Sequence, residues 1–310
     1  MAKKKTVPQA RTRPMTVERG EASSELARET GVSRAALARH PAGLAYESGR
    51  WLGHGLALFG IDLDLAPTVD LDRGEKHNAL DGRYLGRTPE EVTERARAFL
   101  HGLASAGVGG CLKHFPGLGG ASEDTHLEHA PVYLPRSELV TDLQPFLELG
   151  REAGAVMVAH ASYPAYDHDH RPATLSGPIL QGLLRDQVGF DGVAMSDDLE
   201  MKAFEKLGEP QDLAEAAFVL GCDVLLVCHH PELALEMAEG LAERALEARQ
   251  QEAAERLERY RTRLETHRLR DPQRGGLDRH TPGPDLDQVQ ERIAAVKAAG
   301  EREAEEVETA

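Results

Sequence analysis

The stretch 107–119 reads GVGGCLKHFPGLG, an apolar run that stops at a polar loop rich in proline and glycine. The apolar run predicts a buried strand. The loop after it predicts an active-site rim, because α/β proteins concentrate their chemistry on the loops that follow strands. Lys113 and His114 begin this loop, and Asp124 and His126 follow closely. Histidine titrates near neutral pH, so the loop can supply a proton carrier, although a polar loop with incidental histidines is the alternative.

A second loop of the same kind follows the apolar run 189–195. Residues 196–201 read SDDLEM, so Asp197 and Asp198 meet at the end of a predicted strand. Like charges in contact raise one of the two pKa values, and such perturbed groups cluster at functional sites. Asp198 has an alternative role as the N-cap of the next helix, because aspartate is favoured there. Asp197 is therefore the stronger catalytic candidate.

The two loops together resemble glycoside hydrolase family 3, in its branch of single-domain bacterial β-N-acetylglucosaminidases (β-hexosaminidases). The resemblance runs from about residue 46 to about residue 239, and its pieces stand in the family's order. They are LDLAPTVD at 63–70, RYLG at 83–86, KHFPG at 113–117, DTH at 124–126, MVAH at 157–160, PATLS at 172–176, SDDL at 196–199 and GCDVLLV at 221–227. The resemblance implies an α/β fold, a TIM-type (β/α) barrel.

The resemblance also implies a mechanism, the retaining hydrolysis of terminal β-linked N-acetylhexosamine, as in peptidoglycan recycling. The family's carboxylate nucleophile corresponds to Asp197, which would form a covalent glycosyl-enzyme. The family's acid/base, a histidine paired with an aspartate two residues earlier, corresponds to His126 and Asp124. A nearby carboxylate stabilises the imidazolium and holds its pKa near the working pH. A phosphorylase is a variant of this interpretation, since a histidine repels phosphate less than a carboxylate would.

The same resemblance predicts residues that bind the sugar. Lys113 and His114 match the family's contacts to sugar hydroxyls, and Arg83 matches a further binding position with a fixed fork of donors. His160 ends a predicted strand and lies on the predicted rim. It is either part of the pocket wall, and so a binding residue, or a hydrogen-bonded structural histidine.

The chain departs from the family's pattern in two places. Leu118 stands where the family has a histidine, which removes a polar contact from the loop. The family's Asp-x-x-Gly-Gly strand is also not visible, since MTVERGE at 15–21 matches that motif only weakly. We therefore expect a barrel that is incomplete or remodelled at its N-terminus, with added C-terminal helices.

Two other functions compete with the glycosidase. His114, His126, His160 and Asp197 follow different strands, which is how a metal-dependent barrel hydrolase collects its ligands. A degenerate family member that binds sugar without turnover is the third interpretation. The order of the KHFPG and SDDL loops favours the glycosidase, for which we expect no cofactor and no metal.

Length and composition limit the kinds of partner that we expect for this chain. The chain has 310 residues, enough for one barrel of about 250 residues, and a net charge of −16, which argues against nucleic acid. It has no apolar run long enough to span a membrane, and its basic start lacks the apolar segment of a signal peptide. The cysteines at 111, 222 and 228 are expected to be buried, reduced thiols. We expect a cytoplasmic protein that acts on a small carbohydrate.

Three regions follow along the chain. Residues 1–20 predict a disordered tail, 21–268 the catalytic barrel-like domain, and 269–310 a break rich in proline and glycine followed by a charged helix. Expected strands lie near 16–17, 61–69, 109–113, 155–160, 192–196 and 223–228, and expected helices at 21–41, 46–59, 88–105, 231–268 and 286–307. The alternation favours a parallel sheet. The N- or C-terminal helices offer a surface for a homo-oligomer.

Overall fold

The computed structural model describes residues 41–74, 80, 83–121, 131–244, 246–270 and 286–308. The described strands form a parallel pair and a parallel four-stranded sheet of order β3-β4-β5-β6. A bridge between Thr68 and Lys113 joins the two, so the segments that contain β1 and β3 run side by side. The five strands predicted after residue 60 are confirmed in place, and the one predicted at 109–113 appears as two short strands, β2 and β3. The described strands are β1 (Leu63–Asp64), β2 (Gly109–Gly110), β3 (Leu112–Phe115), β4 (Ala155–Val158), β5 (Val193–Asp198) and β6 (Val224–Leu226).

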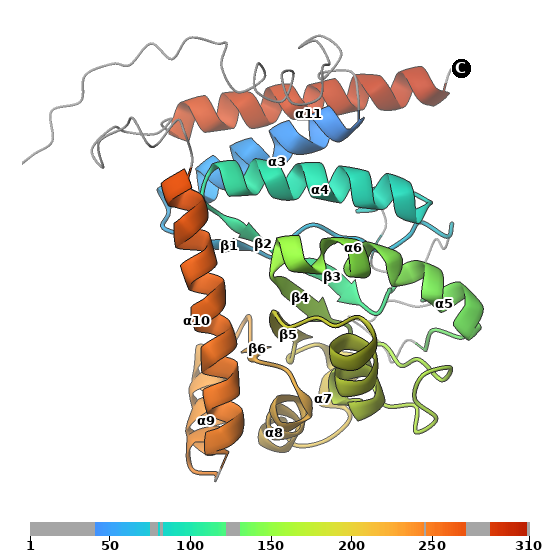
Figure 1. The fold of residues 1–310 in the computed structure, drawn as a ribbon, viewed down its shortest axis with the longest axis vertical. Coiled ribbons are helices and arrows are strands. Elements are labelled where there is room, and N and C mark those ends of the chain that lie inside the picture. Colours follow the sequence, from blue (N-terminus) through green and yellow to red (C-terminus); the bar gives the residue numbers. More distant parts are fainter. Residues whose placement is uncertain are drawn as a thin grey trace, which may run out of the picture.

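Helices connect the strands, and the strands lie in space in the order in which they occur along the chain (Figure 1). A singly wound parallel sheet of this kind is the arrangement of a TIM-type barrel, which confirms the expected fold class. The helical elements are α3 (Pro41–Leu58), α4 (Pro89–Ser105), α5 (Arg136–Asp142), α6 (Gln144–Ala153), the 3₁₀ turn η1 (Ala173–Leu175), the π-helix η2 (Pro178–Gln187), α7 (Lys202–Glu205), α8 (Pro210–Leu220), α9 (Pro231–Ala242), α10 (Glu247–Arg270) and α11 (Leu286–Glu308).

Local sequence accounts for several of these boundaries. Helix α4 begins at the predicted position, because the Thr88 side chain and Glu91 form a capping box with Pro89 in the first turn. The helix predicted over 231–268 is instead two helices, α9 and α10, separated by residues 243–246. The strand expected near 16–17, the helix at 21–41 and the tail at 1–20 lie outside the described residues, so the predicted domain limits stay predictions.

The sheet separates two apolar cores. Successive strand residues point to opposite faces, so Ala194 of β5 packs into the large core between sheet and helices, while Val193 and Met195 face the other side. On that inner face they form a smaller cluster with Tyr260 and Leu264 of α10. Helix α10 therefore covers the inner face of the barrel near the N-terminal ends of its strands (Figure 1).

A buried carboxylate attaches α10 to the sheet. The Asp223 side chain is fully buried just before β6, and its Oδ1 accepts hydrogen bonds from Arg249 (2.7 Å) and Arg256 (3.1 Å) of α10. Its Oδ2 accepts from Arg185 (2.9 Å) of η2 and from the Ala194 backbone N–H (2.9 Å). One carboxylate thus joins α10 and η2 to strand β5.

We expect Asp223→Ala to lower the free energy of unfolding by about 3–5 kcal/mol, because removing one member of a buried ion pair leaves its partners uncompensated. Urea denaturation followed by circular dichroism measures this change.

Asp191→Ala is the matched control for that experiment. Asp191 also pairs with α10, through Arg259 (3.2 Å), but its side chain is 80% exposed. An exposed ion pair contributes about 0–1 kcal/mol. Equal losses of stability in Asp191→Ala and Asp223→Ala would contradict the assigned role of Asp223.

The C-terminal helix was predicted as a charged helix, and the structure shows where it packs. Helix α11 packs back along α3, with Val289 buried and Arg292 over the Trp51 ring at 5.6 Å. Oligomerisation through this helix stays a prediction.

The cysteine prediction was wrong for Cys228, which is exposed in the loop after β6, whereas Cys111 and Cys222 are buried. No described helix is both long and apolar enough to cross a lipid bilayer.

Candidate active site

Asp197 lies at the C-terminal end of β5. It continues the alternation of Val193 and Met195, so its side chain belongs to the inner face, beyond the apolar cluster. Burial alone would raise the pKa of this carboxyl group. The nearby charges of His114, His160 and Lys113 and a hydrogen bond from the Asp198 N–H outweigh burial, and the pKa lies below its ordinary value. Asp197 is therefore an ionised carboxylate at the rim of the barrel.

Lys113 and His114, within β3, lie near the same rim. The His114 side chain is buried, and its Nδ1 lies 2.8 Å from Oδ2 of the buried Asp70. The Asp70 carboxylate also accepts hydrogen bonds from the backbone N–H of His114 (3.2 Å) and of Leu118 (2.7 Å). Asp70 can only accept when ionised, so His114 Nδ1 carries a hydrogen. One carboxylate fixes both the loop backbone and the orientation of the imidazole.

The loop after β3 makes a tight turn against the core. Gly117 has φ 124°, and a Cβ there would lie 2.5 Å from Asp142 Cβ, so only glycine fits without strain. The buried Tyr163 hydroxyl donates to the Gly117 carbonyl at 3.0 Å. The Lys113–His114 and Phe115–Pro116 peptide bonds are both cis. The contacts of Gly117 fix the turn that follows β3, the strand that carries His114.

His160 follows β4 and is only 2% exposed. Its Nε2 lies 3.0 Å from the Asp198 carbonyl, which can only accept, and its Nδ1 lies 2.8 Å from the Thr174 hydroxyl. The ring stacks on Phe204 at a centroid distance of 4.2 Å. Burial lowers the pKa of His160 despite the opposing charge of Asp197. Both ring nitrogens are thus used inside the protein, which favours the structural interpretation, and direct sugar binding by His160 stays a prediction.

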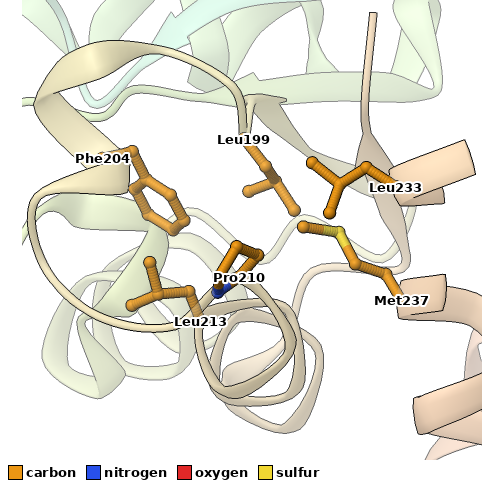
Figure 2. A pocket seen from close by; sticks show the side chains of 6 residues that line it. All are labelled: Leu199, Phe204, Pro210, Leu213, Leu233 and Met237. Atoms are coloured by element: carbon orange, nitrogen blue, oxygen red, sulfur yellow. The ribbon is translucent and has the colours of Figure 1, made fainter. Parts of the chain in front are cut away.

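A small apolar cavity of about 20 Å³ lies beside the loop that follows β5 (Figure 2). It is too apolar to order water and carries no group for chemistry. Its lining comes from the loop after β5 and from α7, α8 and α9, and consists of Leu199, Phe204, Pro210, Leu213, Leu233 and Met237.

The remaining predicted site residues are placed as follows. Asp124 and His126 lie outside the described residues, so their roles stay predictions. Arg83 is exposed in the segment between β1 and α4, and its binding role also stays a prediction. Leu118, where the family has a histidine, is buried in the large core. Asp70 was missed as a functional residue, although a lone carboxylate at the end of the predicted strand 61–69 was a signal for it.

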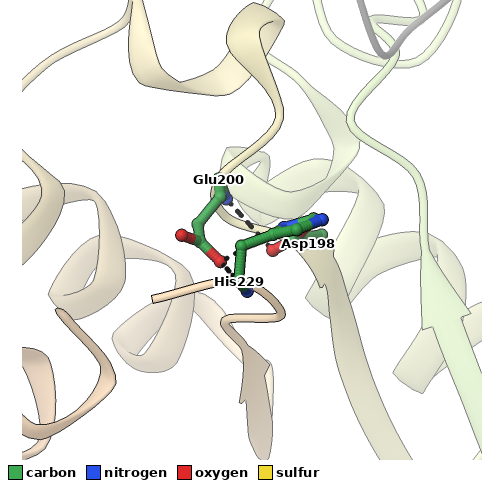
Figure 3. Close-up of side chains that lie close together, drawn as sticks. All are labelled: Asp198, Glu200 and His229. Atoms are coloured by element: carbon green, nitrogen blue, oxygen red, sulfur yellow. Dashed lines mark hydrogen bonds and ion pairs between the residues drawn. The ribbon is translucent and has the colours of Figure 1, made fainter. Parts of the chain in front are cut away.

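One group of possible metal ligands occurs in the part of the chain that the structure describes. It consists of Asp198 at the end of β5, Glu200 in the loop that follows, and His229 in the loop after β6 (Figure 3). The described ligands of the metallohydrolase alternative, His114, His160 and Asp197, do not form such a group. The arrangement at the rim can therefore support an attack by Asp197 on an electrophilic carbon, or stabilise a developing positive charge there.

Comparisons with known proteins agree with this geometry. The model of the glycosyl hydrolase family 3 N-terminal domain matches residues 23–261. A curated β-hexosaminidase of Thioalkalivibrio sulfidiphilus is 39% identical over 199 residues, which are 64% of this chain and 56% of that protein. One from Xanthomonas campestris is 42% identical over 190 residues, again 56% of its length. This chain thus spans little more than half of those curated relatives.

Solved structures show the same likeness. A family 3 β-N-acetylglucosaminidase from Paenibacillus sp. superposes with a TM-score of 0.71 at 31% identity, over 85% of this chain and 51% of that one. NagZ from Neisseria gonorrhoeae, in complex with N-trifluoroacetyl-D-glucosamine, superposes with a TM-score of 0.63 at 32% identity, over 89% and 72%. Since the family model covers most of the sequence and these folds agree with the strand order, the chain belongs to glycosyl hydrolase family 3.

Proposed function

We propose that this protein is a retaining exo-glycosidase that hydrolyses terminal β-linked N-acetylhexosamine, with cell-wall-derived amino sugars as its substrate class. Asp197 attacks the anomeric carbon and forms a glycosyl-enzyme ester while the leaving oxygen takes a proton from His126. His126 then removes a proton from the water that hydrolyses the ester. Asp124 stabilises the imidazolium form of His126.

The observation that carries the proposal is the state of Asp197. A nucleophile must be ionised at working pH, and the positive groups around Asp197 lower its pKa despite burial. Lys113 and His114 adjoin it from β3, where they can donate hydrogen bonds to sugar hydroxyls. The net charge of −16 suits a small neutral sugar better than a polyanion.

A panel of chromogenic aryl β-glycosides tests the proposal. We expect release of nitrophenol from the N-acetylglucosaminide and much slower release from the glucoside. The same rate with and without phosphate identifies a hydrolase, whereas a phosphate-dependent rate identifies a phosphorylase. Turnover of neither glycoside, with saturable binding of N-acetylglucosamine, would favour the degenerate sugar-binding alternative. That alternative rests on the Asp-x-x-Gly-Gly strand that is not visible in the sequence.

Asp70 gives a prediction of its own. We expect Asp70→Asn to lower kcat/KM on the aryl N-acetylglucosaminide about 10- to 100-fold, the range seen when a group that orients a functional histidine is lost. The amide nitrogen of asparagine donates to His114 Nδ1 and so moves the ring hydrogen to Nε2. Nitrogen NMR of His114 reports this change of tautomer. Unchanged kinetics in a variant whose tautomer has moved would show that His114 does not contact the sugar.

A further inference from the structure

The loops after β5 and β6 bring together three groups that the proposed hydrolysis does not use. Asp198 ends β5, Glu200 lies in the loop that follows and His229 in the loop after β6, and their side chains face one another (Figure 3). The possible ligand atoms all lie within 4.8 Å of one another. We propose that Asp198, Glu200 and His229 form a structural Zn²⁺ site that ties the loop of Asp197 to the loop after β6.

The two distances from His229 are compatible with a tetrahedral ion. His229 Nδ1 lies 3.4 Å from Asp198 Oδ2 and 3.6 Å from Glu200 Oε2. Zn²⁺ bonds of about 2.0–2.1 Å in a tetrahedron separate the ligand atoms by about 3.3–3.4 Å. One imidazole nitrogen thus stands at nearly the ligand spacing from two carboxylate oxygens, and water can take the fourth position.

The charge of the group calls for a cation. Asp198 and Glu200 place two carboxylates side by side, and the Glu200 side chain is only 5% exposed. Within the described residues, the side chains at ion-pair distance from either carboxylate are the imidazoles of His229 and His230. The backbone N–H groups of His229 (2.5 Å) and His230 (3.4 Å) also donate to Glu200 Oε2. Neither these dipoles nor neutral imidazoles carry a positive charge, whereas a divalent ion supplies one and uses His229 as a nitrogen ligand.

Neighbouring groups hold the carboxylates in place. His230 Nδ1 contacts Glu200 Oε1, and the backbone N–H groups of His229 and His230 donate to Glu200 Oε2. The backbone N–H groups of Glu200 and Cys228 donate to Asp198 Oδ1, each at 3.2 Å, and so leave Oδ2 directed at His229. Hydrogen bonds of this kind orient the ligands of established metal sites. The set is also separate from the residues of the metallohydrolase alternative.

Calorimetric titration of the metal-free full chain with Zn²⁺ tests the site. We expect one tight equivalent and a Zn²⁺-dependent rise in Tm. His229→Ala should weaken that equivalent at least about tenfold and abolish the rise in Tm, because a direct ligand is lost. His229 is 71% exposed, so its removal should leave the fold intact, which circular dichroism checks.

His168→Ala is the matched control, since His168 is an exposed loop histidine beside aspartates that belongs to no described ligand group. Its Zn²⁺ affinity should equal that of the unmodified protein. No stoichiometric binding, or equal affinity after His229→Ala, would overturn the proposal. Loss of binding in His126→Ala with retention in His229→Ala would overturn it too and favour the metallohydrolase. The titration needs no substrate, so its outcome is independent of the glycoside panel.

Discussion

Asp197→Ala is expected to lower kcat for the aryl N-acetylglucosaminide by at least about 10⁴-fold, the scale seen when a covalent nucleophile is removed. The carboxylate is the only atom group proposed to bond to the anomeric carbon, so hydrogen bonding by other rim residues cannot replace it. Stopped and steady-state assays of nitrophenol release measure the loss. Circular dichroism confirms that the variant is folded, as expected for a half-buried residue at the end of a strand.

Adding azide tests specifically whether Asp197 is the nucleophile. In Asp197→Ala a small anion can enter from the face that the carboxylate occupied and attack the sugar directly, which gives the α-glycosyl azide. Asp198→Asn is the matched control, because it alters only the neighbouring carboxylate. The backbone carbonyl of Asp198 contacts His160, and its side chain accepts a hydrogen bond from the Glu200 N–H, so this residue holds the loop in place. Near-normal turnover by a folded Asp197→Ala protein would refute the retaining assignment.

His126→Ala is expected to slow the hydrolysis of natural β-N-acetylglucosaminides by about 10²–10⁴-fold, the usual contribution of general acid catalysis. A sugar alkoxide is a poor leaving group and needs a proton, whereas an activated nitrophenolate leaves with little help. Formation of the glycosyl-enzyme from the aryl glycoside should therefore suffer much less. Comparing rates on a disaccharide and on the aryl glycoside measures the difference.

The second step gives a further readout for His126. Without its base, the intermediate on Asp197 should accumulate, and mass spectrometry should detect the adduct. Azide then attacks that ester from the opposite face and yields the β-glycosyl azide. Asp124→Asn should act in the same direction, because losing the carboxylate lowers the pKa of His126 and moves the alkaline side of the pH–rate profile to lower pH. Equal slowing on both substrates without azide rescue would make His126 a binding residue.

Local sequence was sufficient for much of the fold. The apolar runs at 109–115, 155–158 and 193–198 form strands because short apolar segments between turn residues have few other ways to be buried. Helix α4 begins where Thr88 and Pro89 predict, since a capping box is made by residues only three apart. The motifs likewise single out Asp197, Lys113 and His114 as candidates, and the structure places them within β5 and β3.

Tertiary structure decided what depends on contacts between distant segments. Asp70 and His114 are 44 residues apart in the sequence, and Glu200 and His229 are 29 residues apart, yet each pair is in contact. The sequence predicted one helix over 231–268, but only packing shows that its second part, α10, covers the inner face, where Tyr260 reaches β2 at Gly109. Composition alone misplaced Cys228, because burial depends on what covers a loop and not on the residue itself. Interactions between residues close in the sequence determine where helices and strands form. Burial and charge pairing between distant segments determine which faces and side chains meet.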